Sequence, residues 1–353
     1  MPSQFYPIDV KSVKSETENA VSIFFDIPAE LRDVFRYKAG QYVTLRLTID
    51  GKTFNRAYSL GSSPAVDESL FITVKKTEYG FVSSYLAENV QPGNTIYLLP
   101  PLGNFTVDFS SDNSRLFILF GGGSGITPLF SIIKTALLRE PESRMILFYA
   151  NRDDRSIIYD KDLNHLSATS GGRLRVLHSL SEPSNNISAI TGQITPAQVR
   201  TLLAEHIPDE IRAAHYFICG PTGMMQLVED VLAAENVPGS QIHREQFLAQ
   251  HDASEAPPAP PKERNINVRL YGREYNISVA TGATILEAAI DQNLDPPYAC
   301  QIAACCTCRA KLINGKVQMD NREALTDEEL DEGYILTCQS HPLTDDVLVD
   351  YDQ

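Results

Sequence analysis

The sequence contains no long apolar run and no signal-like pattern at its start. A membrane-spanning helix needs about 18 consecutive apolar residues, and no stretch of the 353 residues approaches that length. Residues 1–5 lack the basic, apolar and small-residue regions of a secretion signal. We therefore expect a cytoplasmic protein without a membrane span, whose clustered cysteines bind metal or act in catalysis rather than form disulfides.

Positive charge is also scarce. The formal net charge is −15 at pH 7, whereas binding to nucleic acid needs a basic surface that neutralises phosphates. The charge is uneven, because 15 acidic but only 6 basic residues lie between Asn265 and the end. We expect no nucleic-acid partner, and we expect the acidic C-terminal part to attract a basic protein partner.

Four cysteines with a distinctive spacing are present. Cys300, Cys305 and Cys308 follow the pattern Cys-x4-Cys-x2-Cys, and Cys338 comes after 29 intervening residues. Plant-type [2Fe–2S] clusters are held by four thiolates at this spacing. Zinc is the alternative, but structural zinc sites usually combine two short Cys-x2–4-Cys pairs, and this set has one. The spacing favours an iron–sulfur cluster, with Cys306 inside the loop as a non-ligand.

A Pro/Ala-rich run marks a boundary late in the chain. Residues 253–262 read Ala-Ser-Glu-Ala-Pro-Pro-Ala-Pro-Pro-Lys, a composition that favours extended conformations and acts as a spacer. We therefore predict a linker over 250–264 and a separate domain over 265–353.

The hydrophobic pattern divides the remaining chain at about residue 110. Over 1–110, short β-rich runs such as Tyr42–Ile49 alternate with turn signals, which predicts a sandwich or barrel. Over 111–249, short apolar strands such as Leu116–Phe120 alternate with helical stretches, which predicts a doubly wound parallel sheet. Over 265–353, two strands and a capped helix precede the cysteine loop, and further strands follow it.

Two glycine-rich turns follow strands of the middle segment. The first, Gly121–Pro128, reads Gly-Gly-Gly-Ser-Gly-Ile-Thr-Pro, and the second is Cys219–Gly223. Glycines let a ligand approach the backbone closely, and a helix N-terminus binds pyrophosphate. Pro128 stands where the usual dinucleotide fingerprint has a third glycine or alanine. Because both turns lie at carboxyl ends of parallel strands, together they predict a nucleotide crevice.

Two weaker patterns lie in the first segment. Residues 56–59 read Arg-Ala-Tyr-Ser, which combines a guanidinium for bidentate phosphate contacts with a flat ring and a small hydroxyl. Residues 80–83 read Gly-Phe-Val-Ser. Each pattern also suits an ordinary strand or turn, so neither decides a function alone.

In their order along the chain, these motifs resemble those of the ferredoxin–NADP⁺ reductase superfamily, in its oxygenase-reductase branch. The resemblance implies a multi-domain protein with an antiparallel FAD-binding β-barrel, an NAD(P)-binding doubly wound α/β domain and an α+β ferredoxin domain of β-grasp type. It also implies FAD, a [2Fe–2S] cluster and a nicotinamide nucleotide as cofactors. Oxygenase subunits would accept the electrons.

The resemblance assigns functions to individual residues. Those expected to bind FAD or the nucleotide are Arg56, Ala57, Tyr58, Ser59, Gly80, Val82, Ser83, Gly123, Gly125, Thr127, Pro128, Arg152, Gly220 and Phe247. Those expected at the catalytic centre are Tyr58, Ser59, Cys219 and Glu245. The expected cluster ligands are Cys300, Cys305, Cys308 and Cys338.

By the same likeness, Arg56 and Ser83 hold the flavin pyrophosphate. Tyr58 stacks on the isoalloxazine ring, and Ser59 approaches its N5 atom. The first glycine turn lines the nucleotide pyrophosphate, and Cys219 lies near the nicotinamide.

The choice between NADPH and NADH depends on the end of one strand. An acidic residue there would favour NADH by binding the ribose, whereas residues 150–152 end in Arg152, which could meet a 2′-phosphate. Asp153 and Asp154 follow directly and weaken this argument. We expect NADPH, with NADH as the alternative.

Within the oxygenase-reductase branch, the sequence resembles the reductase components of phenylacetyl-CoA epoxidases. Residues 56–64, 305–311 and 349–353 carry this likeness. Reductases of the 3-ketosteroid 9α-hydroxylase type share the architecture, and a ferredoxin-like or stress reductase is a further alternative. A protein of another class, a zinc-stabilised flavin-binding module without an electron exit, also stays open.

Overall fold

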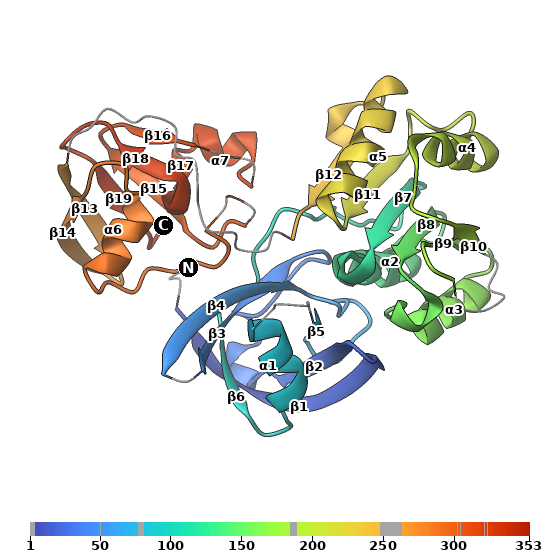
Figure 1. Cartoon of the computed structure of the whole chain (residues 1–353), viewed down its shortest axis with the longest axis horizontal. Helices are drawn as coiled ribbons and strands as arrows, with labels where there is room; N and C mark the ends of the chain where they lie inside the picture. The colour runs from blue at the N-terminus through green and yellow to red at the C-terminus, as the bar shows by residue number, and fades with distance from the viewer. Residues whose placement is uncertain are drawn as a thin grey trace.

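Three large sheets follow one another along the chain. A computed structural model describes residues 4–49, 51–76, 81–183, 189–247, 263–301, 303, 305–320, 322 and 324–353. Figure 1 shows the first sheet in blue, the second from green to yellow and the third from orange to red. Gly80 and residues 250–262 of the predicted linker lie outside the described residues.

The first sheet is antiparallel and closes into a barrel. Its strands, in the order β4-β3-β6-β1-β2-β5, are β1 (Tyr6–Thr17), β2 (Ala20–Asp26), β3 (Tyr42–Ile49), β4 (Lys52–Ser59), β5 (Phe71–Lys75) and β6 (Thr95–Leu98). A bridge between Leu60 and Ile72 joins the two ends of the sheet. The short helices are η1 (Ala29–Leu31) and α1 (Phe81–Asn89). The predicted antiparallel barrel is confirmed.

The second sheet is parallel and has helices on both faces. Its strand order is β10-β9-β8-β7-β11-β12. The strands are β7 (Leu116–Gly122), β8 (Arg144–Asn151), β9 (Leu174–Leu180), β10 (Ala189–Thr191), β11 (His215–Cys219) and β12 (Ile242–Glu245). The helices are η2 (Gly123–Gly125), α2 (Ile126–Arg139), η3 (Asp154–Ser156), α3 (Asp160–Thr169), α4 (Pro196–His206), α5 (Thr222–Ala234) and η4 (Gly239–Gln241).

Strand β7 explains why this sheet could be recognised from its sequence. Phe117 and Leu119 belong to the core beneath α2 and α3, whereas Ile118 and Phe120 belong to the core beneath α4 and α5. A strand buried on both faces is apolar at every position. The predicted doubly wound sheet is confirmed.

The third sheet mixes parallel and antiparallel pairs. Its strand order is β14-β13-β19-β15-β17, and β16 pairs with β18 separately. The strands are β13 (Arg264–Leu270), β14 (Arg273–Val279), β15 (Arg309–Asn314), β16 (Val317–Met319), β17 (Tyr334–Leu336), β18 (Ser340–Pro342) and β19 (Leu348–Asp350). The helices are α6 (Ile285–Asp291), α7 (Asp327–Asp331) and η5 (Thr337–Gln339). The arrangement confirms the predicted α+β ferredoxin domain.

Local sequence accounts for the start of α6. The hydroxyl of Thr284 accepts a hydrogen bond from the Glu287 N–H at 3.2 Å, and the Glu287 carboxylate accepts one from the Thr284 N–H at 2.8 Å. Such a capping box satisfies two backbone donors at once.

Across the described residues, no helix combines the length and apolarity that a membrane crossing requires.

Candidate active site and cluster-binding loop

The carboxyl ends of three strands meet between the barrel and the nucleotide-binding sheet. Ser59 ends β4, and its Oγ donates to Oε2 of Glu245, the last residue of β12, at 2.7 Å. Glu245 in turn pairs in register with Cys219, which ends β11. The structure therefore brings together Ser59, Glu245 and Cys219, three residues that are distant in the sequence.

Burial dominates the electrostatics of this corner. It raises the pKa of Glu245 to about 7, although the hydrogen bond from Ser59 opposes the rise and the nearby Cys305 adds to it. Burial, assisted by the charge of Glu245, also raises the pKa of the Cys219 thiol well above its usual value. Near neutral pH the carboxyl group can hold or release a proton, whereas Cys219 stays a neutral thiol.

Arg56 and the first residue of α1 both lie near the Phe54 ring. The Arg56 Cζ atom is 5.8 Å from the centre of that ring, which lies 5.5 Å from the ring of Phe81, the first residue of α1. The first turn of α1, which includes Val82 and Ser83, carries no acidic residue. A guanidinium and a helix N-terminus in the same region are groups that bind pyrophosphate, so the residues fit the phosphates of FAD.

Two residues of β4 make different contacts. Tyr58 packs against the barrel core, and burial raises the pKa of its hydroxyl well above the usual value. Ala57 instead packs against a small cluster formed by Tyr42, Ala299 and Cys305. The predicted flavin-binding strand therefore packs against the same small cluster as the cysteine loop.

The two glycine turns pack against each other. A Cβ atom at Gly125 would clash with the carbonyl oxygen of Cys219, and one at Gly220 would lie 2.9 Å from the backbone nitrogen of Gly122. Gly123 has a φ of +54°, in the left-handed region that favours glycine. These close approaches explain the need for glycine in both turns.

The helix α2 begins directly at the first glycine turn. Thr127 donates from Oγ1 to the carbonyl oxygen of Ser124 at 2.9 Å. Pro128 lies in the first turn of the helix, where its missing N–H has no partner to lose. The turn thus presents a helix N-terminus next to glycine backbone, as a nucleotide pyrophosphate requires.

Lys75, the last residue of β5, is a cation near this turn that the sequence analysis missed. Its Nζ lies 3.2 Å from the position that a Cβ of Gly123 would occupy. Burial and the nearby charge of Arg152 lower the pKa of Lys75, while Asp153 opposes the change. Arg152 is largely exposed and pairs with Asp153 at 3.1 Å. The sequence does contain one signal for this cation, because the β-rich run that begins at Leu70 ends in Lys75 and Lys76, shortly before residues 80–83.

The four predicted ligands form two pairs. Hydrogen bonding links Cys305 with Cys300 and Cys308 with Cys338. Within the described parts of the chain, no three His, Cys, Asp or Glu side chains gather around one point that could hold an ion. A two-iron cluster takes two thiolates on each iron, so the two pairs fit such a cluster. The Cys306 thiol instead donates to the carbonyl oxygen of Ala324 at 2.8 Å.

A cavity of about 160 Å³ lies where the three domains meet. Tyr42 and Phe105 line it from the barrel, Glu245 from the nucleotide domain, and Cys305 and Cys306 from the cysteine loop. The cavity therefore adjoins both the Ser59–Glu245 corner and the cysteine loop.

Phe247, two residues beyond Glu245, is 43% exposed.

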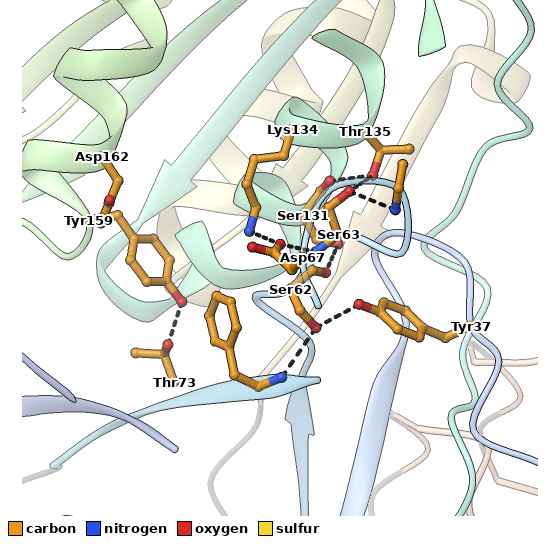
Figure 2. A network of polar contacts seen from close by, with 12 residues as sticks. Tyr37, Ser62, Ser63, Asp67, Thr73, Ser131, Lys134, Thr135, Tyr159 and Asp162 are labelled. Carbon is orange, nitrogen blue, oxygen red and sulfur yellow. Dashed lines mark hydrogen bonds and ion pairs between the residues drawn. The ribbon is translucent and has the colours of Figure 1, made fainter. Parts of the chain in front are cut away.

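A second polar network joins the barrel to the nucleotide domain, as Figure 2 shows. Lys134 of α2 forms an ion pair with Asp67 of the barrel, and its ammonium lies between two aromatic rings. Asp67 also accepts from the Ser63 N–H at 2.6 Å, and the hydroxyls of Ser63 and Thr135 are 2.8 Å apart. This network fixes how the two domains face each other.

Comparison with known proteins identifies the family. Sequence profiles match an oxidoreductase FAD-binding domain at 7–107, an oxidoreductase NAD-binding domain at 119–230 and a 2Fe-2S iron-sulfur cluster binding domain at 268–343. The chain is 35% identical to the ferredoxin reductase component of 3-ketosteroid-9-alpha-monooxygenase from Rhodococcus rhodochrous, covering 98% of this chain and 96% of that one. The chain belongs to the oxygenase reductases of the ferredoxin–NADP⁺ reductase superfamily.

Two further comparisons support this family assignment. A component of the 1,2-phenylacetyl-CoA epoxidase from Escherichia coli is also 35% identical, over 99% of this chain and 98% of that one. The solved structure of phthalate dioxygenase reductase shares the fold, with a TM-score of 0.58, 21% identity and 98% of both chains covered. The oxygenase reductase described here is accordingly an NAD(P)H-dependent flavin iron–sulfur oxidoreductase.

Proposed function

We propose that this oxygenase reductase transfers electrons from NADPH to the oxygenase component of a phenylacetyl-CoA epoxidase. The likeness of residues 56–64, 305–311 and 349–353 to the epoxidase reductases supports the proposal, as does the full-length similarity to the Escherichia coli epoxidase component. A 3-ketosteroid 9α-hydroxylase system is the second candidate, because its reductase component is equally similar.

The packing of Ala57 against the apolar cluster that Tyr42 forms with Ala299 and Cys305 of the cysteine loop carries the electron-transfer part of the proposal. When bound, FAD and the [2Fe–2S] cluster supply the redox chemistry that converts a two-electron donor into one-electron transfers. The protein binds and orients them. Arg56 and the first turn of α1 hold the flavin pyrophosphate, Tyr58 supports the flavin ring, and the Ser59–Glu245 pair holds a proton at its edge.

Two cations support NADPH as the electron donor. Lys75 lies beside the glycine turn, and Arg152 is close enough for its charge to lower the pKa of Lys75. Mutual repulsion between two cations is relieved by a bound phosphate group. Arg152→Ala should lower kcat/KM for NADPH while leaving that for NADH nearly unchanged. A wild-type enzyme that prefers NADH would contradict the assignment.

The acidic surface of the ferredoxin domain supports a basic partner. Glu328 of α7 and the neighbouring Asp331 and Glu332 are exposed, and charge complementarity speeds the association of electron-transfer proteins. Raising the ionic strength should therefore slow electron transfer to the oxygenase but not to ferricyanide. Equal salt dependence with both acceptors would argue against electrostatic steering.

Reconstitution with candidate oxygenases tests the proposed partner. The purified reductase is mixed with the oxygenase component of a phenylacetyl-CoA epoxidase or with a 3-ketosteroid 9α-hydroxylase, and product formation per NADPH is measured. We expect coupled turnover with the epoxidase. Turnover with only the steroid enzyme would assign the reductase to the second candidate, and turnover with neither would reject both.

A further inference from the structure

Three polar side chains on the outer face of β3 contact the ferredoxin domain. Tyr42, Thr44 and Arg46 share this face because successive side chains of a strand point to opposite sides. Val43 and Leu45, which lie between them, are buried in the barrel core. Tyr42, Thr44 and Arg46, in contrast, contact a distant part of the same chain.

Tyr42 and Thr44 contact the cysteine loop through their hydroxyl groups. The backbone N–H of Cys306 donates to Tyr42 Oη at 3.1 Å. The Thr307 hydroxyl lies 3.1 Å from Thr44 Oγ1 and 3.4 Å from Tyr42 Oη. All these contacts are buried, and a buried N–H without an acceptor is costly. The loop therefore depends on hydroxyl groups of the barrel.

Thr307 extends this contact to a predicted cluster ligand. Its Oγ1 lies 3.3 Å from the Sγ of Cys305. A thiolate that binds iron can only accept hydrogen bonds, so the hydroxyl of Thr307 must then be the donor. Hydrogen bonds to ligand sulfurs are one way in which proteins set the reduction potential of a cluster. The hydroxyls of Tyr42 and Thr44 orient this donor.

Arg46 fixes the interface a short distance away. Its guanidinium donates two hydrogen bonds to the carboxylate of Asp295, at 2.7 and 2.9 Å. A bidentate pair defines orientation as well as distance. The cysteine loop itself packs, through Ala299 and Cys305, into the cluster of Tyr42 that also contacts Ala57 of the predicted flavin-binding strand.

We propose that the outer face of β3, through Tyr42, Thr44 and Arg46, is a docking surface that positions the cluster loop for electron transfer from the flavin. The inference rests on the proposed electron-transfer function and names the residues that set its geometry. The three act on the cluster through Thr307 and through the orientation of the domain, so they are positioning residues and not catalytic ones.

The double variant Tyr42→Phe/Thr44→Val removes both hydroxyls with little change in shape. In an anaerobic single turnover, we expect flavin reduction by NADPH at the wild-type rate and transfer from flavin to cluster slowed at least about tenfold. The midpoint potential of the cluster, measured by redox titration with electron paramagnetic resonance, should become more negative. The matched control is Tyr97→Phe/Thr48→Val, which removes the same atoms at exposed positions of the same sheet.

Two different results would contradict the docking surface and the proposed function, respectively. A double variant with wild-type flavin-to-cluster transfer and an unchanged midpoint potential would overturn the docking surface while leaving the proposed function intact. A wild-type enzyme whose cluster stays oxidised after the flavin is reduced would instead refute the proposed function.

A charge exchange tests the same surface if the double variant does not fold. Arg46→Glu should slow flavin-to-cluster transfer about two- to fivefold, as expected for a partly exposed ion pair. Adding Asp295→Arg to that variant should restore most of the rate. Wild-type transfer in Arg46→Glu, or an effect that Asp295→Arg does not reverse, would contradict a docking role for this pair.

Discussion

Glu245 is the residue whose environment has the clearest pH consequence. Burial raises the pKa of its carboxyl group to about 7, well above that of the same group in the unfolded chain. Between these two values the native state binds more protons than the unfolded state. The free energy of unfolding should therefore fall as the pH rises through this interval.

Glu245→Gln should remove this dependence. From about pH 5.5 to about pH 8, the wild type should lose on the order of 2 kcal/mol of stability relative to the variant. Thermal unfolding of both proteins at a series of pH values measures the difference. Parallel stability curves would contradict a raised pKa at this position.

Cys305→Ser tests the assignment of the cluster ligands. Loss of one thiolate should abolish the reduction of cytochrome c, a one-electron acceptor, while ferricyanide reduction by the flavin stays largely intact. Cys306→Ser is the matched control, because that neighbouring thiol donates to the Ala324 carbonyl and should be dispensable for cluster assembly. Equal loss of both activities in Cys305→Ser would contradict the separation of the two steps.

The sequence could predict the cysteine set because its spacing is specific, but it could not predict the residues that dock the loop. Tyr42 and Cys306 are 264 positions apart, so no local pattern links them. The alternation in β3 did separate its polar from its apolar side chains. What the polar side chains contact depends on how two domains meet, and composition contains no such information.

At the scale of elements, the two glycine turns illustrate how strand ends create a site. Gly125 is pressed against the end of β11, and a Cβ atom there would clash with the Cys219 carbonyl. Gly125→Ala should therefore displace one turn from the other and weaken NADPH binding about tenfold or more, since overpacking costs about 1–3 kcal/mol. Calorimetric titration with NADP⁺ measures the effect.

Gly223→Ala provides the control for that experiment. Gly223 lies in α5, and a Cβ there would meet nothing within 4 Å. Alanine also favours a helix interior over glycine, so the variant should bind the nucleotide like the wild type. Similar affinities in the two variants would show that the close approach of the turns is not needed.

The ion pair between Lys134 and Asp67 holds the barrel against α2 (Figure 2). Asp67→Asn leaves a buried ammonium without its counter-ion and should cost about 3 kcal/mol of stability. Lys134→Met in the same chain should recover most of that loss, because the uncompensated charge is gone. Denaturant unfolding of the single and double variants measures this, and additive losses would contradict the expected coupling.

Elements with a strong apolar period were predicted within a few residues, whereas several weakly patterned elements were missed, among them α1, α3 and β1. Helix α3 buries only Leu163, and α1 buries only Val82 and Leu86. Strand β1 is mostly polar, with Ile8 and Val10 as its fully buried residues. These elements are held by neighbouring strands and helices, so their own sequences carry little periodic signal.

At the scale of the whole molecule, the barrel is the common partner of both other domains. Its β4 end meets Glu245 of the nucleotide domain, and its β3 face meets the cysteine loop. The proposed donor, flavin and cluster sites therefore lie near one another although they belong to different domains. The domain boundaries and the linker at 250–264 stay predictions, because the described residues omit most of that segment.

The central claim is that electrons from a nicotinamide nucleotide reach the cluster through the flavin of the same chain. The most direct test adds NADPH anaerobically to the purified reductase and records absorbance and electron paramagnetic resonance together. We expect the flavin absorbance to bleach first and the electron paramagnetic resonance signal of a reduced [2Fe–2S] cluster to grow afterwards. Bleaching of the flavin without any cluster signal would contradict it.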